Sequence, residues 1–105
     1  MKKTIMLICA AGMSTSLLVN KMKKVAEDKG IDADIFAISA NEADEYFASK
    51  KVDALLLGPQ VRFMKSQFED KVTPLGIKLE VIPMVDYGTM NGEKVLDLAL
   101  KLING

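Results

Sequence analysis

Short apolar runs alternate with segments of helical character along the whole chain, and this alternation limits the folds open to it. Strands are expected at Thr4–Ile8, Ala33–Ile38, Ala54–Leu57 and Glu80–Met84. The segments that follow these runs space their apolar residues three or four apart, as helices packed on one face do. Repeated strand–helix units predict an α/β fold, in which helices cover both faces of a parallel sheet. With 105 residues, the chain is expected to form a single domain over residues 1–105.

Turn and capping residues set the expected ends of the helices. The first helix is expected over Ser14–Lys29, and Gly30 is expected to end it. The segment Ser39–Glu42 resembles a capping box at the start of the second helix. A third helix is expected between the last two strands. The fourth runs over Asn91–Ile103, which leaves residues 85–90 as a loop.

The composition of the four runs predicts their order in the sheet. The first and third runs are continuously apolar, as expected of strands buried on both faces. Asp34 interrupts the second run, and Pro83, which lacks an N–H group, lies in the fourth, so these two are expected at the edges. Right-handed crossovers then give the order 2-1-3-4. The order reverses between strands 1 and 3, and ligands in such sheets bind at the carboxyl ends of the strands beside that reversal.

The chain's only cysteine, Cys9, directly follows the first apolar run and is therefore expected at this reversal point. A loop of small and hydroxyl-bearing residues separates it from the first helix, and backbone N–H groups of such a loop can converge on an anion. The positive end of the helix dipole also favours a thiolate over a thiol. We therefore predict that Cys9 is a nucleophile and that the loop is its phosphate-binding cradle. The predicted cradle consists of Ala10, Ala11, Gly12, Met13, Ser14, Thr15 and Ser16.

The composition argues against several other kinds of site and partner. Because the chain has no histidine, it has no Cys-His dyad and no histidine metal ligand, and neither a metal nor a cofactor is expected. Acidic and basic residues balance at 14 each, which creates no overall field for nucleic acid. The apolar runs are too short to span a bilayer, and one unpaired cysteine is typical of a reducing compartment. We therefore expect a cytoplasmic protein that is not itself a membrane protein, and a monomer.

A cysteine phosphatase is the first alternative for such a loop. The loop of a protein tyrosine phosphatase also begins with cysteine, but it ends with an arginine that holds the phosphate and stabilises the transition state of hydrolysis. Thr15 occupies that position here, and the chain's single arginine, Arg62, lies outside the loop. Without the guanidinium, a phosphoryl group on sulfur is expected to react slowly with water, which is the property of a carrier.

The segment Leu7–Leu18 resembles the phosphocysteine loop of enzyme IIB proteins of the bacterial phosphoenolpyruvate-dependent sugar phosphotransferase system (PTS), in particular the lactose/cellobiose/chitobiose type. The resemblance extends to Leu55–Val61, Asp86–Gly88 and Met90–Gly92, and so covers nearly the whole chain. It implies a four-stranded parallel sheet similar to that of low-molecular-weight protein tyrosine phosphatases, which agrees with the order argued above.

The resemblance also implies a role in sugar uptake. Cys9 would accept a phosphoryl group from the phosphohistidine of a IIA partner and pass it to a disaccharide bound in the membrane permease IIC. The protein would then be a phosphotransferase with cellobiose, chitobiose or lactose as the sugar. Backbone amides from Ala10 to Ser14, helped by the hydroxyl groups of Ser14, Thr15 and Ser16, would hold the phosphoryl oxygens.

Four residues outside the loop are candidates for the rim of the crevice or for contact with phosphate. Gln60 and Arg62 follow the third strand, and Asp86 and Tyr87 follow the fourth. Arg62 either contacts phosphate or a partner, or is a solvated residue at the start of a helix. Asp86 corresponds to the general acid of low-molecular-weight phosphatases, or else caps the loop.

Two further interpretations concern partners and function. Met13 and Met90 lie in loops near the predicted site and are expected to form an adaptable apolar contact face. Besides the carrier, a low-molecular-weight-type cysteine phosphatase and a non-enzymatic anion-binding or regulatory domain stay open. A thiol redox role is weaker, because the chain has no second cysteine.

Overall fold

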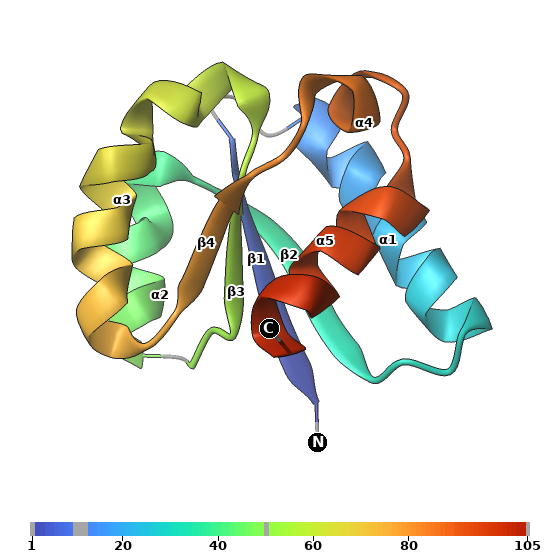
Figure 1. Ribbon diagram of the computed structural model, residues 1–105, viewed down its shortest axis with the longest axis horizontal. Helices are drawn as coiled ribbons and strands as arrows, with labels where there is room; N and C mark the ends of the chain where they lie inside the picture. Colours follow the sequence, from blue (N-terminus) through green and yellow to red (C-terminus); the bar gives the residue numbers. More distant parts are fainter. Residues whose placement is uncertain (1, 10–12, 50, 105) are drawn as a thin grey trace.

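The computed structural model describes residues 2–9, 13–49 and 51–104, which form an α/β fold around one four-stranded sheet (Figure 1). The pairings β1–β2, β1–β3 and β3–β4 are all parallel, and the strand order β2-β1-β3-β4 is the predicted one. The strands are β1 (Lys3–Cys9), β2 (Ala33–Ser39), β3 (Ala54–Leu57) and β4 (Lys78–Val81).

Helices cover both faces of the sheet, which confirms the predicted layers. Figure 1 shows α1 and α5 on one face, α2 and α3 on the other, and α4 beside the carboxyl ends of the strands. Among the described residues, no helix combines the length and the hydropathy that a membrane span requires. The helices are α1 (Met13–Asp28), α2 (Ala43–Ser49), α3 (Lys65–Val72), α4 (Met84–Gly88) and α5 (Gly92–Asn104), and the 3₁₀ turns are η1 (Ala40–Glu42), η2 (Pro59–Met64) and η3 (Thr73–Leu75).

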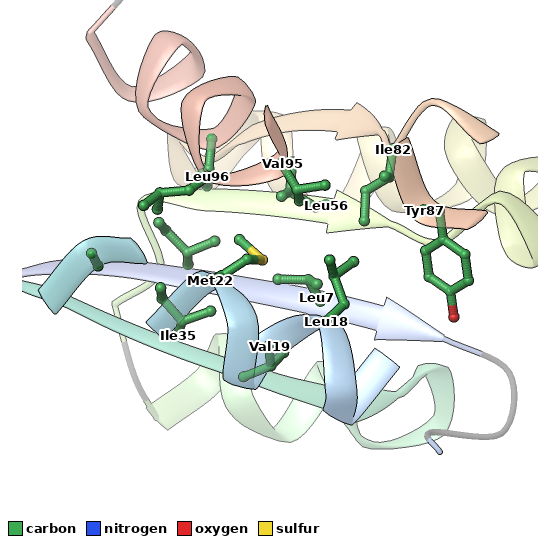
Figure 2. Packing of buried hydrophobic residues seen from close by; sticks show 14 residues of the cluster. Leu7, Leu18, Val19, Met22, Ile35, Leu56, Ile82, Tyr87, Val95 and Leu96 are labelled. Atoms are coloured by element: carbon green, nitrogen blue, oxygen red, sulfur yellow. The ribbon is translucent and has the colours of Figure 1, made fainter. Parts of the chain in front are cut away.

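Strand β1 is buried on both of its faces. Ile5 and Leu7 belong to the cluster under α1 and α5, while Met6 and Ile8 belong to the cluster under α2 and α3, and none of the four is exposed. Figure 2 shows Leu7 beside Leu18 of α1 in the first cluster. Since successive side chains of a strand point to opposite faces, a strand between two helical layers needs an unbroken apolar run.

Both edge strands are those predicted, although the reason given for β4 was wrong. Asp34 is exposed on β2, as expected at an edge. Strand β4 lies two to three residues earlier than predicted and ends at Val81, so Pro83 falls outside the strand and precedes α4 as its cap. The open edge of β4 is instead protected by Glu80, whose carboxylate accepts the backbone N–H of Val81 at 3.0 Å.

The short helix α4 begins at Met84 and occupies most of the predicted loop at residues 85–90, which corrects that prediction. The Thr89 hydroxyl donates to the carbonyl oxygen of Val85 at 2.8 Å and thereby closes the last turn. Helix α5 was predicted to start at Asn91 but begins at Gly92. Asn91 caps this helix, because its side-chain oxygen accepts the backbone N–H of Lys94 at 3.1 Å. A helix of only five residues has too little periodicity to be recognised in a sequence.

Helix ends elsewhere agree with the prediction in part. Helix α1 is displaced by one residue at each end, and Gly30 follows it with a positive φ of 69°, as predicted for the stop. The capping box at Ser39 does not form, because the Ser39 hydroxyl donates to the Glu42 carboxylate at 2.9 Å and makes no bond to the backbone of the turn. The chain therefore passes through η1 before α2 begins at Ala43.

Gly92 allows α5 to approach α1 closely. A Cβ atom at this position would lie 2.8 Å from the carbonyl carbon of Lys21 and 2.9 Å from the nitrogen of Met22, which are both backbone atoms. Gly88, in contrast, has nothing within 4 Å of an added Cβ. Helices α1 and α5 together cover β1 and β3 on one face of the sheet. Their close contact depends on glycine at residue 92, which has no side chain.

We expect Gly92→Ala to lower the free energy of unfolding by about 1–3 kcal/mol, because overpacking forces the two helices apart. The matched variant Gly88→Ala is expected to change it by less than about 1 kcal/mol. Urea unfolding followed by circular dichroism measures both values. Equal midpoints for the two variants would contradict the close approach of α5 to α1.

Candidate active site

Cys9 lies at the carboxyl end of the central strand. It is the last residue of β1, and its partner in the pairing with β2 is Ser39. The residue is buried, with 2% of its surface exposed, and its Sγ lies 3.9 Å from the carbonyl oxygen of Ile38. The strand order reverses between β1 and β3, so the cysteine stands at the predicted reversal point.

The amino terminus of α1 belongs to the same edge of the sheet. Ala10, Ala11 and Gly12 of the predicted cradle lie outside the described residues, as do the side chains of Met13 and Ser14. The backbone of α1 begins at Met13, so only three residues join it to the strand that carries the cysteine. The amino terminus of a helix is a place where a bound anion is stabilised by backbone N–H groups and by the helix dipole.

Thr15 and Tyr87 meet at this edge of the sheet. Their hydroxyl oxygens are 2.9 Å apart in a buried hydrogen bond that joins α1 to α4. Of the predicted loop hydroxyl groups, that of Thr15 is thus bonded to Tyr87, while Ser16 is exposed. Tyr87, which was predicted at the rim, is a buried residue of the cluster under α1 and α5, and Figure 2 shows its hydroxyl beyond the ends of the strands.

The turn after β3 lies directly against the end of β1. The N–H of Gly58 donates to the carbonyl oxygen of Ile8 at 2.9 Å, one residue before the cysteine. A Cβ on Gly58 would lie 2.7 Å from the side-chain oxygen of Gln60 and 3.4 Å from the oxygen of Ile8. Gln60 therefore folds its amide back over this turn, next to the last residues of β1.

Asp86 and Arg62 have different surroundings. Asp86 is half-buried and lines a hollow between α4 and α5, together with Lys94 and Leu98. Arg62 is exposed on η2, outside the segment between β1 and α1. The described contacts therefore connect Gln60 and Tyr87 to the end of β1, and they connect Asp86 to α5.

Four large apolar side chains are exposed around the carboxyl ends of the strands. We call them the apolar rim: Leu17 is 59% exposed, Phe63 79%, Met84 63% and Val85 74%. They lie on α1, η2 and α4, the elements that follow β1, β3 and β4. Because parallel strands all end at one edge of the sheet, the elements that carry these side chains all begin at the edge where β1 ends.

The contact face that we predicted at Met13 and Met90 consists of other residues than the apolar rim and stays a prediction. Met90 is half-buried and packs against the cluster under α1 and α5, and the side chain of Met13 is not described. One signal for the rim was present in the sequence. Leu17 is adjacent to the buried Leu18 and cannot share its face of a helix, because neighbouring helical residues point about 100° apart.

Comparison with known proteins agrees with this arrangement. The family described as "PTS system, Lactose/Cellobiose specific IIB subunit" matches residues 4–98 of the chain. The cellobiose-specific EIIB component of the PTS from Lactococcus lactis subsp. lactis (strain IL1403) is 53% identical over 105 residues, which cover 97% of each protein. The galactose-specific EIIB component from Lactococcus lactis subsp. cremoris (strain MG1363) is 52% identical over the same share of both chains.

A solved structure extends the likeness to the fold. The solution structure of a cellobiose-specific phosphotransferase IIB component from Borrelia burgdorferi superposes with a TM-score of 0.80 at 46% sequence identity, over 99% of this chain and 94% of that one. Sequence family, relatives and fold thus agree over nearly the whole length. The chain belongs to the lactose/cellobiose-specific IIB family of the PTS, whose members are phosphotransferase components of sugar uptake.

Proposed function

We propose that this protein carries a phosphoryl group on Cys9 from a phosphohistidine of a IIA protein to a disaccharide bound in the membrane permease IIC. The observation that carries the proposal is the position of Cys9, the last residue of an inner strand that is buried from Ile5 onward, with three residues between it and the start of α1. Only residues 10–12 separate a sulfur nucleophile from a helix end that favours anions.

Two displacements at phosphorus make up the proposed cycle. The Cys9 thiolate attacks the phosphorus of the phosphohistidine, the phosphorus–nitrogen bond breaks, and its electron pair returns to the imidazole. A sugar hydroxyl oxygen then attacks the phosphorus of phospho-Cys9, the sulfur–phosphorus bond breaks and the thiolate is regenerated, while the hydroxyl proton leaves to a base. Such transfers depend mainly on alignment and on stabilising the charge of the phosphoryl oxygens.

Backbone N–H groups supply that stabilisation in the proposal. The sequence has no basic residue between Cys9 and Asn20, and Arg62 is exposed on η2. We assign the phosphoryl oxygens to the amides of residues 10–14, assisted by the positive end of α1. This arrangement supports storage of the phosphoryl group more than its hydrolysis, because the cation that accelerates attack by water in cysteine phosphatases is missing.

The phosphatase alternative has less support. Thr15 stands where a phosphatase loop would carry arginine, and its side chain is buried against Tyr87. Asp86, the candidate general acid, lines the hollow beside α5. The sugar is proposed only as a disaccharide, after the lactose/cellobiose family and the cellobiose-specific relative, and a relative of almost equal identity carries the name of a monosaccharide, galactose.

The experiment for the carrier function is intact mass after incubation with phosphoenolpyruvate, the general PTS transfer proteins and a candidate IIA. We expect the parent protein to gain the mass of one phosphoryl group, and peptide mapping to place it on Cys9. Cys9→Ser exchanges a single atom and is expected to gain nothing at the same donor concentration. Lack of a gain with every IIA tested would contradict the carrier and leave the cysteine phosphatase and the anion-binding domain.

We further propose that the phosphorylated IIA protein docks on the apolar rim. Its histidine must come within bonding distance of a sulfur whose residue is 2% exposed, so the two protein surfaces must fit closely around the end of β1. The rim offers large apolar side chains from three elements at this place, and exposed apolar side chains around a functional group are typical of interaction sites. A few well-packed side chains commonly provide most of the binding energy at an interface.

Phe63→Asp and Val85→Asp are each expected to lower kcat/KM for phosphorylation by IIA about tenfold or more, because they place a charge in the interface. Their unfolding midpoints should stay close to that of the parent, since both residues are largely exposed. Leu75→Asp is the matched control, because Leu75 is 54% exposed on η3, at the opposite end of the sheet. Equal losses for all three variants would contradict docking on the rim.

A further inference from the structure

We infer that Tyr87 is a positioning residue for the reaction at Cys9 and acts through its hydrogen bond to Thr15. The inference rests on the proposed phosphoryl transfer. Tyr87 lies on α4 and Thr15 on the first turn of α1, 72 positions apart in the sequence, and their hydroxyl oxygens are 2.9 Å apart. The bond therefore connects the end of α1 that faces the cysteine to the element that follows β4.

Both partners of this bond are shielded from water. Thr15 is 1% exposed, and Tyr87 is buried in the cluster under α1 and α5. A buried hydroxyl must find a partner inside the protein. Two apolar residues of the same shape could serve stability equally well, so packing alone gives no reason for this pair of hydroxyl groups.

A hydrogen bond fixes what the apolar contacts of α1 leave adjustable. The helix packs on the sheet through Leu18, Val19 and Met22, which Figure 2 shows in the cluster under α1 and α5. Apolar burial has no preferred direction, whereas a hydrogen bond weakens steeply when its distance and angle change. The bond to Tyr87 therefore sets how the first turn of α1 is rotated about the helix axis and where it lies along that axis.

The Tyr87 ring also lies near the turn after β3. A Cβ on Gly58 would lie 3.8 Å from Cε2 of the Tyr87 ring, and the N–H of Gly58 donates to Ile8 beside the cysteine. Figure 2 shows the ring at the carboxyl ends of the strands, with its hydroxyl directed toward the start of α1. This side chain, on the segment that follows β4, thus bonds to the segment that follows β1 and lies near the one that follows β3.

This arrangement has a direct consequence for phosphoryl transfer. The N–H groups at the amino terminus of α1 can stabilise charge on phosphorus only if they stay aligned with the sulfur at the end of β1. Misalignment by about 1 Å can cost about 100-fold in rate. Neither Thr15 nor Tyr87 belongs to the exposed apolar rim, so loss of their bond should slow the transfer step without weakening donor binding.

Rapid-mixing measurements of Cys9 phosphorylation by phosphorylated IIA, at several donor concentrations, test the inference. Tyr87→Phe and Thr15→Val each remove one hydroxyl and keep the packing, and we expect each to lower the maximal rate about 10- to 100-fold. The donor concentration for half-maximal rate should be unchanged. The double variant should be no slower than the slower single variant, since both remove the same bond.

Two control variants separate positioning from general effects of substitution. Thr15→Ser keeps the hydroxyl and should retain most of the maximal rate. Tyr46→Phe removes the hydroxyl of the only other tyrosine, which stacks on Phe36 on the opposite face of the sheet, and should transfer like the parent. Circular dichroism and unfolding midpoints verify that each variant is folded at the assay temperature, and either hydroxyl deletion suffices if the other fails to fold.

The outcomes distinguish this inference from the proposed function. A parent-like maximal rate for folded Tyr87→Phe or Thr15→Val would overturn the positioning role while the carrier function stands. A lower unfolding midpoint without a change in maximal rate would overturn it as well, because it would show a purely structural bond. If the parent protein is never phosphorylated on Cys9, both the carrier function and the role of Tyr87 are overturned.

Discussion

Burial of β1 on both faces is the constraint on which the rest of the structure depends. Its side chains alternate between the two core clusters, so a shift by one residue would place every side chain in the cluster on the opposite face of the sheet. The parallel pairing of β1 with β2 and β3 then fixes where its carboxyl end lies. Cys9 occupies that end, and the segments after β3 and β4 arrive beside it because all strands run in the same direction.

The chemistry of the site follows from what this edge of the sheet provides. It provides the amino terminus of α1, a turn at Gly58 that bonds to β1, and the buried pair of Thr15 and Tyr87. The sequence between Cys9 and Asn20 contains no basic residue, so this segment brings no positive side chain to the site. Dipoles stabilise a phosphoryl group in place, whereas a guanidinium also accelerates its hydrolysis, and the difference separates a carrier from a phosphatase built on a similar sheet.

The sequence was sufficient to predict the sheet order and the position of Cys9, because both depend on unbroken apolar runs and on the reversal between strands 1 and 3. Short elements and contacts between distant parts of the sequence were less predictable. Helix α4 spans only five residues, and Pro83 is compatible with a strand edge or with the start of a helix. The bond between Thr15 and Tyr87 joins positions 72 apart, and the exposure of Phe63 depends on tertiary packing, so no local pattern reveals either.

The most direct test of the account is the lifetime of the phosphorylated protein. The protein is phosphorylated, separated from its donor and followed by intact mass, in buffer alone and after addition of membranes that contain a matching permease with its disaccharide. A carrier predicts that the phosphoryl group stays on Cys9 in buffer far longer than one transfer takes, and that it appears as sugar phosphate once permease and sugar are added. Rapid loss as inorganic phosphate, at the same rate with and without permease, would contradict the account.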